Sequence, residues 1–286
     1  MKQIKTFIKN ILWQKWLNKS LRAIKIMEVA EDNTTKRLAK SLKHAIQEKE
    51  LSQEERGWIE NIEKIRENID KNTSEIEVID YGAGNPEDNR SKEEMYKGFI
   101  NKCRVCDMNI ASKPPFWARV LFTLIREFQP QTSVELGTCL GISSAYQASA
   151  MLINKKGKLI TMEGSPELVK ISQKHLDSLG ISNVEIIEGR FQDNLLEVLE
   201  KNKPIDYVFI DGHHDEKATI EYYNTFLPYL SDETVLVFDD ISWSKGMTNA
   251  WNTIIKDQQI KIAINFKVIG ICIINKGTSQ QKIYNL

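Results

Sequence analysis

Short apolar runs alternate with amphipathic stretches along the second half of the chain. Helix-length stretches of about 10–15 residues separate the first runs, whereas only a few residues separate the last two. This alternation is typical of βαβ units. It predicts an α/β fold with a seven-stranded doubly wound sheet and an antiparallel last strand, so that the last two strands pair at the sheet edge. The runs are Ser133–Leu136, Leu159–Met162, Val184–Ile187, Tyr207–Ile210, Val235–Phe238, Ala263–Phe266 and Gly270–Ile274.

Residues 1–75 have helical periodicity, which predicts a helical N-terminal region over residues 1–79. One helix is predicted from Thr35 to Glu50, and another begins at Ser52, where Ser52 and Glu55 form a capping box. The first helix carries one apolar face, formed by Ile4, Phe7, Ile8, Ile11 and Leu12. Lysines and arginines fill its other positions. We therefore expect residues 1–25 to mediate self-association, with a homo-oligomer as the result, or to bind a membrane surface peripherally.

Residues 80–115 are rich in turn formers and charge, and they predict a loop or lid with one short helix from Lys92 to Phe99. The segment Asp80–Gly84 resembles a cofactor-binding turn, but a turn and not an amphipathic helix follows it. We therefore assign it to a loop that closes over the active site. The predicted organisation is a helical region (1–79), a loop or lid linker (80–115) and a cofactor-binding domain (116–286).

The charge balance and the cysteine content narrow the class of protein. Lysine plus arginine equals aspartate plus glutamate at 39 each, which argues against nucleic acid as a partner. No apolar run reaches the length of about 18 residues that a membrane-spanning helix needs, and the N-terminus lacks the pattern of a signal peptide. Four cysteines in 286 residues give no disulfide framework, so a cytoplasmic location is expected.

The turn after the first strand of the sheet carries the first candidate chemistry. In doubly wound sheets ligands bind at the carboxyl ends of the strands. Here Gly137 and Gly141 allow the backbone to approach a ligand before a helix begins, and Glu135 stands two residues upstream. This spacing is not that of a dinucleotide-binding turn, and an upstream acid suits an ammonium group better than a diphosphate. A plain tight turn is the alternative.

The next two strand ends extend the candidate site. Glu163 ends the second strand, where an acid can bind both hydroxyls of a ribose, although it could instead cap the helix that starts at Pro166. The third strand leads into Arg190, Phe191 and Gln192, and an adenine ring could lie against Phe191. Together these positions predict a nucleoside-containing ligand.

Acids and histidines gather at the ends of the fourth and fifth strands. Asp211, Asp239 and Asp240 would lie on one rim and repel one another unless a cation or hydrogen-bond donors neutralised them. Oxygen ligands suit Mg²⁺ or a similar divalent cation. In the alternative, Asp211 binds the cofactor's ammonium and Asp239 or Asp240 caps a helix. His214, or its neighbour His213, has a pKa suited to a general base.

The four motifs, in this order, resemble those of class I S-adenosylmethionine-dependent methyltransferases, with a Rossmann-like fold. The nearest similarity is to bacterial O-methyltransferases, including catechol, caffeoyl-CoA and macrolide-sugar enzymes, over residues from about 113 to 275. The resemblance implies S-adenosyl-L-methionine as cofactor. It places the cofactor on Glu135, Gly137, Gly141, Ser143, Glu163, Arg190, Phe191, Gln192 and Asp211.

The same resemblance assigns the catalytic and metal positions. Asp211, Asp239 and Asp240 fall where the metal-dependent members hold a cation, and His214 falls where catechol-type enzymes have a lysine base. Asp211 and His214 are then the catalytic pair. The expected reaction is methyl transfer to an oxygen of a small hydroxylated molecule such as a sugar, natural product or phenol. Two rivals are a nicotinamide-dependent oxidoreductase and a catalytically silent cofactor-binding or interaction protein.

Overall fold

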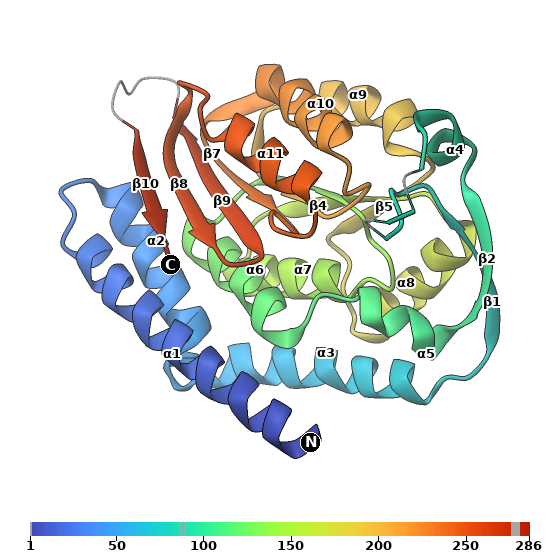
Figure 1. Ribbon diagram of the computed structural model, residues 1–286, viewed down its shortest axis with the longest axis horizontal. Helices are drawn as coiled ribbons and strands as arrows, with labels where there is room; N and C mark the ends of the chain where they lie inside the picture. Colours follow the sequence, from blue (N-terminus) through green and yellow to red (C-terminus); the bar gives the residue numbers. More distant parts are fainter. Residues whose placement is uncertain (1, 86, 89, 276–280) are drawn as a thin grey trace.

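The computed structural model describes residues 2–85, 87–88, 90–275 and 281–286, and the side chains of residues 2–8 are outside the described part. Its centre is an eight-stranded sheet in the order β10-β8-β9-β7-β6-β3-β4-β5 (Figure 1). β9 runs antiparallel to β7 and β8, and the other neighbours are parallel. The strands are β3 Thr132–Leu136, β4 Lys158–Glu163, β5 Val184–Glu188, β6 Ile205–Ile210, β7 Leu230–Phe238, β8 Ile260–Phe266, β9 Ile269–Asn275 and β10 Lys282–Asn285.

The predicted α/β fold with its seven strands is confirmed, and the last two predicted strands form the expected antiparallel pair β8–β9. The sheet has one strand more than predicted, because β10 pairs in parallel with β8 and forms the edge. β10 is short and alternates half-buried with exposed residues, so it lacks the apolar run by which the other strands are recognised.

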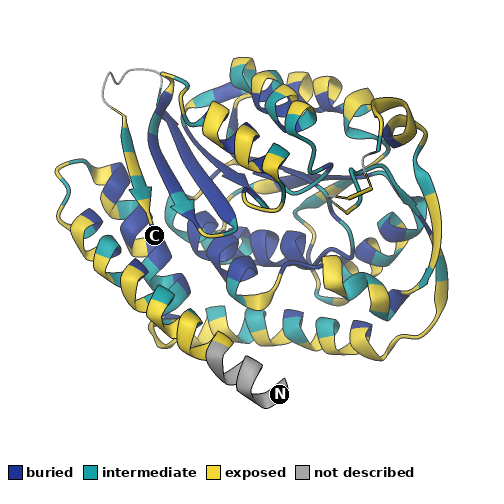
Figure 2. Ribbon diagram, viewed as in Figure 1, coloured by how far each residue is buried: buried dark blue, intermediate teal, exposed yellow. Residues whose placement is uncertain are grey.

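Helices cover both faces of the sheet, which buries the central strands from two sides (Figures 1 and 2). One face is covered by α6 Pro115–Phe128, α7 Ile142–Asn154 and α8 Pro166–Ser178. The other is covered by α9 Phe191–Asn202, α10 Glu216–Phe226 with the short η3 Leu227–Tyr229, and α11 Lys245–Ile254. The parallel register brings the carboxyl ends of β3, β4, β6 and β7 to one edge of the sheet.

Three N-terminal helices form an outer layer over α6 and α7. They are α1 Lys2–Glu28, α2 Asn33–Ile46 and α3 Gln53–Lys71, with η1 Glu48–Glu50 between the last two. α3 begins with the predicted capping box of Ser52 and Glu55. Leu38 of α2 and Ile62 of α3 belong to the same buried cluster as Leu121 of α6 and Tyr146 of α7. The N-terminal helices therefore share one hydrophobic core with the sheet.

The buried side of α1 differs from the predicted apolar face. Ile24 and Met27 are buried, and Trp13 and Trp16 join an aromatic cluster with Phe116, Trp117 and Phe266. Ile11 and Leu12 are exposed, and the side chains of Ile4, Phe7 and Ile8 lie outside the described residues. Within the described part of the chain, no helix is long and apolar enough to cross a membrane.

Residues 75–111 are more ordered than the predicted loop. β1 Glu75–Asp80 and β2 Phe99–Arg104 form a two-stranded antiparallel hairpin, with the predicted short helix, α4 Lys92–Lys97, between them. α5 Val105–Met108 and η2 Asn109–Ala111 then lead to α6. The strands escaped prediction because acids interrupt β1 and most of both strands is exposed or half-buried. β1 also begins inside the region that was predicted to be helical.

Candidate active site

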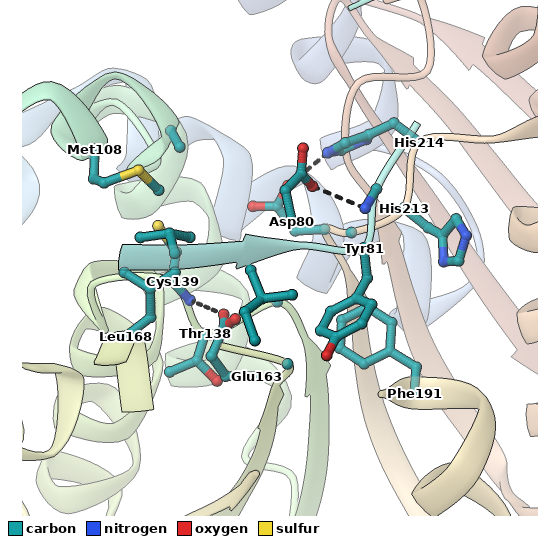
Figure 3. A pocket seen from close by; sticks show the side chains of 18 of the residues that line it. Asp80, Tyr81, Met108, Thr138, Cys139, Glu163, Leu168, Phe191, His213 and His214 are labelled. Carbon is teal, nitrogen blue, oxygen red and sulfur yellow. Dashed lines mark hydrogen bonds and ion pairs between the residues drawn. The ribbon is translucent and has the colours of Figure 1, made fainter. Parts of the chain in front are cut away.

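A cavity of about 310 Å³ lies at the carboxyl ends of β3, β4 and β6 and is bordered by the turn that follows β1 (Figure 3). Nine predicted site residues line it: Gly137, Ser143, Glu163, Arg190, Phe191, Gln192, Asp211, His213 and His214. Four others do not: Glu135, Gly141, Asp239 and Asp240. The sequence therefore located the cavity, but four of the predicted site residues lie outside its wall.

The floor of the cavity depends on the absence of a side chain at Gly137. Its φ of 105° is in the left-handed region, and a Cβ there would overlap the backbone oxygen of Asp211. Its amide donates to the carbonyl of Met162 at 3.0 Å. This turn is thus fixed between the ends of β4 and β6.

Gly141 has a packing function. It precedes α7 with a φ of 79°, and an added Cβ would lie 3.0 Å from Cβ of Ser172 in α8. The close approach of two helices, and not contact with a ligand, requires a glycine here.

Glu135 was expected to reach the methionine part of the cofactor, but its carboxylate is fully buried beneath the turn. It accepts hydrogen bonds from Gln147 Nε2 at 2.8 Å, from Thr161 Oγ1 at 2.7 Å and from Ser144 Oγ. Burial raises its pKa. The structure places Glu135 as a support of the turn and of the first turn of α7, away from the cavity.

Glu163 lies in the cavity wall with its carboxylate oriented by two backbone amides (Figure 3). Oε2 accepts from Cys139 N at 2.8 Å and Oε1 accepts from Ser165 N at 2.9 Å. Burial raises the pKa of Glu163. The backbone amide of Gly164 also acts on this carboxylate, and the four lone pairs of its two oxygens still leave room for a hydrogen bond from a ligand hydroxyl.

The predicted adenine edge lies where α9 begins. The ring of Phe191 fills the space that a side chain at Gly212 would need, since a Cβ there would lie 2.6 Å from Phe191 Cε2. Arg190 stacks on Tyr96 with its guanidinium carbon 3.7 Å from the ring centroid and donates to the Tyr96 carbonyl at 2.8 Å. Arg190 thereby links this edge of the cavity to α4.

The two histidines have different partners. His213 is buried, and its Nδ1 lies 2.8 Å from Tyr222 Oη and 3.3 Å from Gln192 Nε2. His214 has its Nε2 3.7 Å from Asp211 Oδ1, and its Nδ1 has no hydrogen-bond partner among the described residues. Burial lowers the pKa of both imidazoles, which favours the neutral form at neutral pH. His214 thus has a buried ring nitrogen, Nδ1, that no described group satisfies, and its other nitrogen, Nε2, faces Asp211.

Sequence reasoning missed Lys113, which occupies the centre of the acidic rim. Its Nζ lies 3.0 Å from Asp211 Oδ2 and makes a second ion pair with Asp239. Burial would lower the pKa of Lys113, but the two carboxylates outweigh burial and raise it. Burial and the neighbouring Asp211 raise the pKa of Asp239 to about 7. One lysine ammonium thus offsets part of the negative charge of the rim.

This arrangement does not fit the predicted divalent cation. Within the described residues, no group of three or more histidine, cysteine or acidic side chains is placed to hold a metal ion. Two of the three expected ligands, Asp211 and Asp239, are bound to Lys113, and Asp239 and Asp240 do not line the cavity. The expectation that the acids need compensation was correct, but an ammonium provides it.

The turn after β1 borders the cavity, as the loop assignment of Asp80–Gly84 anticipated (Figure 3). Arg90 Nη1 donates to Asp80 Oδ2 at 2.6 Å and to the Gly82 carbonyl at 2.9 Å. Ala83 N donates to the His213 carbonyl at 2.7 Å, which joins this turn to the strand ends of the sheet. We call residues 80–84 the lid turn.

Comparisons with known proteins agree with this geometry. Residues 134–241 match the family described as "Methyltransferase domain". Catechol O-methyltransferase from Niastella koreensis is 32% identical over 143 residues, which cover 49% of this chain and 63% of that protein. Catechol O-methyltransferase from Mus musculus is 29% identical over 126 residues, covering 43% and 47% respectively. The matches thus span less than two thirds of the length of these relatives.

A solved structure extends the comparison to the fold. A methyltransferase from Podospora anserina, bound to S-adenosylhomocysteine, has a TM-score of 0.52 with this chain and 16% sequence identity. The alignment covers 59% of this chain and 81% of that one. The resemblance expected from the four motifs is confirmed: residues 134–241 match a methyltransferase domain, and the chain shares its fold with the methyltransferase from Podospora anserina.

Proposed function

We propose that this protein transfers a methyl group from S-adenosylmethionine to an oxygen of a small hydroxylated molecule. The observation that carries the proposal is the cavity at the carboxyl ends of β3, β4 and β6. It combines a glycine floor at Gly137, an oriented carboxylate at Glu163 and a half-buried imidazole at His214. The similarity to O-methyltransferases supports the same reaction.

The residues present fit this cofactor at three points. Gly137 leaves room above the end of β3, Glu163 can accept hydrogen bonds from the ribose, and the ring of Phe191 offers a flat apolar surface to the adenine. When bound, S-adenosylmethionine supplies a sulfonium-activated methyl group. The protein's own task is then to align the acceptor oxygen and to keep water away from it.

His214 is proposed as the general base. Its lowered pKa keeps the imidazole neutral at neutral pH, so its unprotonated nitrogen can accept a proton from the acceptor hydroxyl. Asp211, with its Oδ1 3.7 Å from Nε2, stabilises the imidazolium that results. His213 is held by Tyr222 and is the weaker candidate.

We propose that the acceptor reaches His214 from the groove on the outer side of the lid turn. This groove has a volume of about 740 Å³ and shares Ala83, Gly84 and His214 with the cofactor cavity. Trp243, which is 48% exposed, lines it and offers an aromatic surface to a sugar or a phenol. The acceptor class is therefore a small molecule with an apolar or ring-shaped face.

The first test is binding of S-adenosylhomocysteine by calorimetry. Replacing Glu163 by alanine removes a charge-assisted hydrogen bond of about 1.5–3 kcal/mol and should weaken binding by about 10–100-fold. Glu188→Ala is the matched control, because Glu188 ends the neighbouring strand β5 in register with Glu163 but does not line the cavity. Equal affinities in the wild type and Glu163→Ala would overturn the assignment. Binding without turnover on any hydroxylated acceptor would favour a silent cofactor-binding protein.

Self-association and a cytoplasmic location remain proposals. The four cysteines are free thiols, which suits a reducing compartment. Ile11 and Leu12 leave an exposed apolar area on α1, and a second copy of the chain could cover it. Light scattering of the variant Ile11→Lys/Leu12→Lys tests this proposal. A mass equal to that of the wild type would contradict it.

A further inference from the structure

We propose that Lys113 replaces the divalent cation of metal-dependent O-methyltransferases. Its ammonium is the resident cation at the ends of β6 and β7, so the site has no affinity for Mg²⁺ while Lys113 is present. The catalytic role of Lys113 in this inference rests on the proposed function. The exclusion of metal is tested by metal binding, which is independent of methyl transfer.

The ammonium stands between the two carboxylates that a metal ion would need. Nζ contacts Asp211 Oδ2 at 3.0 Å and also Asp239, and the side chains of Lys113, Asp211 and Asp239 are only 8%, 13% and 2% exposed. In so buried a site a second cation beside the ammonium would meet strong repulsion and little screening. Lysine and metal are therefore mutually exclusive here.

The chain holds Lys113 in this place from both sides. Its carbonyl accepts a hydrogen bond from Arg66 Nη2 at 2.7 Å, and Pro114 and Pro115 follow it at the start of α6. The ring of Phe209 in β6 lies 5.7 Å from Nζ. The hydrogen-bonded backbone and the closely packed ammonium indicate that the fold fixes Lys113 in this position. They do not suggest a mobile side chain that happens to occupy a metal site.

Lys113 also lines the cofactor cavity, together with Asp211 and His214. A metal ion there would bind the acceptor oxygen directly as a Lewis acid. An ammonium offers instead positive charge and an N–H donor, which hold the acceptor oxygen beside His214 and stabilise its developing negative charge. Lys113 would thus position the acceptor without metal.

The test is titration with Mn²⁺ alone, followed by electron paramagnetic resonance, on the full chain. The wild type should bind no Mn²⁺ at this site. Lys113→Ala frees both carboxylates and should bind one equivalent at least about tenfold more tightly than the wild type. Adding Asp239→Ala to Lys113→Ala should abolish that gain. Lys170→Ala is the matched control, since Lys170 pairs with Glu167 far from the rim and at high exposure.

Two results would overturn the proposal. One is stoichiometric Mn²⁺ binding by the wild type that Asp239→Ala removes, and the other is a Lys113→Ala variant that binds no better than the wild type. Lys113→Asn is the second variant if the alanine form does not fold, because its amide can hydrogen-bond the acids and ligate Mn²⁺. S-adenosylhomocysteine binding, measured separately, shows whether the proposed function itself fails.

Discussion

Two glycine turns that look alike in the sequence line the same cavity from different parts of the fold. The turn at Gly137 follows β3 in the middle of the eight-stranded sheet, whereas the lid turn follows β1 of the two-stranded hairpin. The first is fixed by backbone contacts to the ends of β4 and β6, and a long helix, α7, follows it. The second is held by the side chain of Arg90 and by one backbone hydrogen bond, from Ala83 N to the His213 carbonyl.

The difference shows that the surroundings of a strand, and not the turn that ends it, decide what such a turn can do. A turn between buried parallel strands has no room to move, so it can present fixed groups to a ligand. A turn on a small, half-exposed hairpin can open when a few side-chain contacts break. We therefore expect the sheet side to carry binding and chemistry and the lid side to control access.

The largest effect is expected at His214, on the sheet side. His214→Gln should lower kcat by about 10²–10⁴-fold, the usual range for the loss of a general base. In the wild type the rate should rise with pH as the imidazole loses its proton, with a midpoint below the ordinary value of 6.5 because burial lowers the pKa. Release of S-adenosylhomocysteine in the presence of an accepted hydroxylated substrate measures both.

His213→Gln is the control. The imidazole of His213 is next to His214 in the sequence but is hydrogen-bonded to Tyr222, so it should contribute far less to kcat. A slow His213 variant with a fast His214 variant would reverse the assignment of the base.

The second largest effect is expected at Gly137, in the floor of the cofactor cavity. Gly137→Ala combines a strained left-handed backbone, at about 1–3 kcal/mol, with overlap of the Asp211 carbonyl. Affinity for S-adenosylhomocysteine should fall by about 10–100-fold in calorimetry. Gly180→Ala has the same kind of φ, 70°, but nothing within 4 Å of the new Cβ, so it should cost stability only. If both variants bound equally well, the sheet-side turn would not be a rigid floor.

These expectations also show what could be predicted from the sequence. Strand ends are predictable because apolar runs fix where strands stop, and parallel neighbours bring residues such as Glu163 and Asp211 to one rim. β1 and β10 were not predicted, because half-exposed strands have no such apolar run. Lys113 was not predicted for another reason. It contacts Asp239, 126 residues further along the chain, only because of the tertiary fold. No local pattern marks a lone lysine in a loop as a counter-ion.

The third effect is expected on the lid side. Arg90→Ala removes the hydrogen bond to the Gly82 carbonyl, the ion pair with Asp88 and the contact with Phe99, together with the partly exposed ion pair to Asp80, which alone is worth about 0.5–1 kcal/mol. The lid turn should open more often, and S-adenosylhomocysteine should dissociate about two- to fivefold faster in stopped-flow measurements. Arg104→Ala is matched, because it breaks an arginine–aspartate pair between the end of β2 and Asp107 in α5, and neither residue lines the cavity. Equal dissociation rates in all three proteins would mean that the turn does not act as a lid.

The smallest effect separates packing from function in the N-terminal region. Trp16 stacks in the aromatic cluster and donates its indole N–H to the carbonyl of Leu286 at 3.1 Å. Trp16→Phe keeps a ring but loses this hydrogen bond, so the free energy of unfolding in urea should fall by about 0.5–1.5 kcal/mol. Trp13→Phe is the control, since Trp13 belongs to the same cluster but its indole makes no hydrogen bond among the described residues. Affinity for S-adenosylhomocysteine should stay unchanged in both, because neither tryptophan lines the cavity; a loss of affinity in Trp16→Phe would show that α1 influences the cofactor site across the shared core.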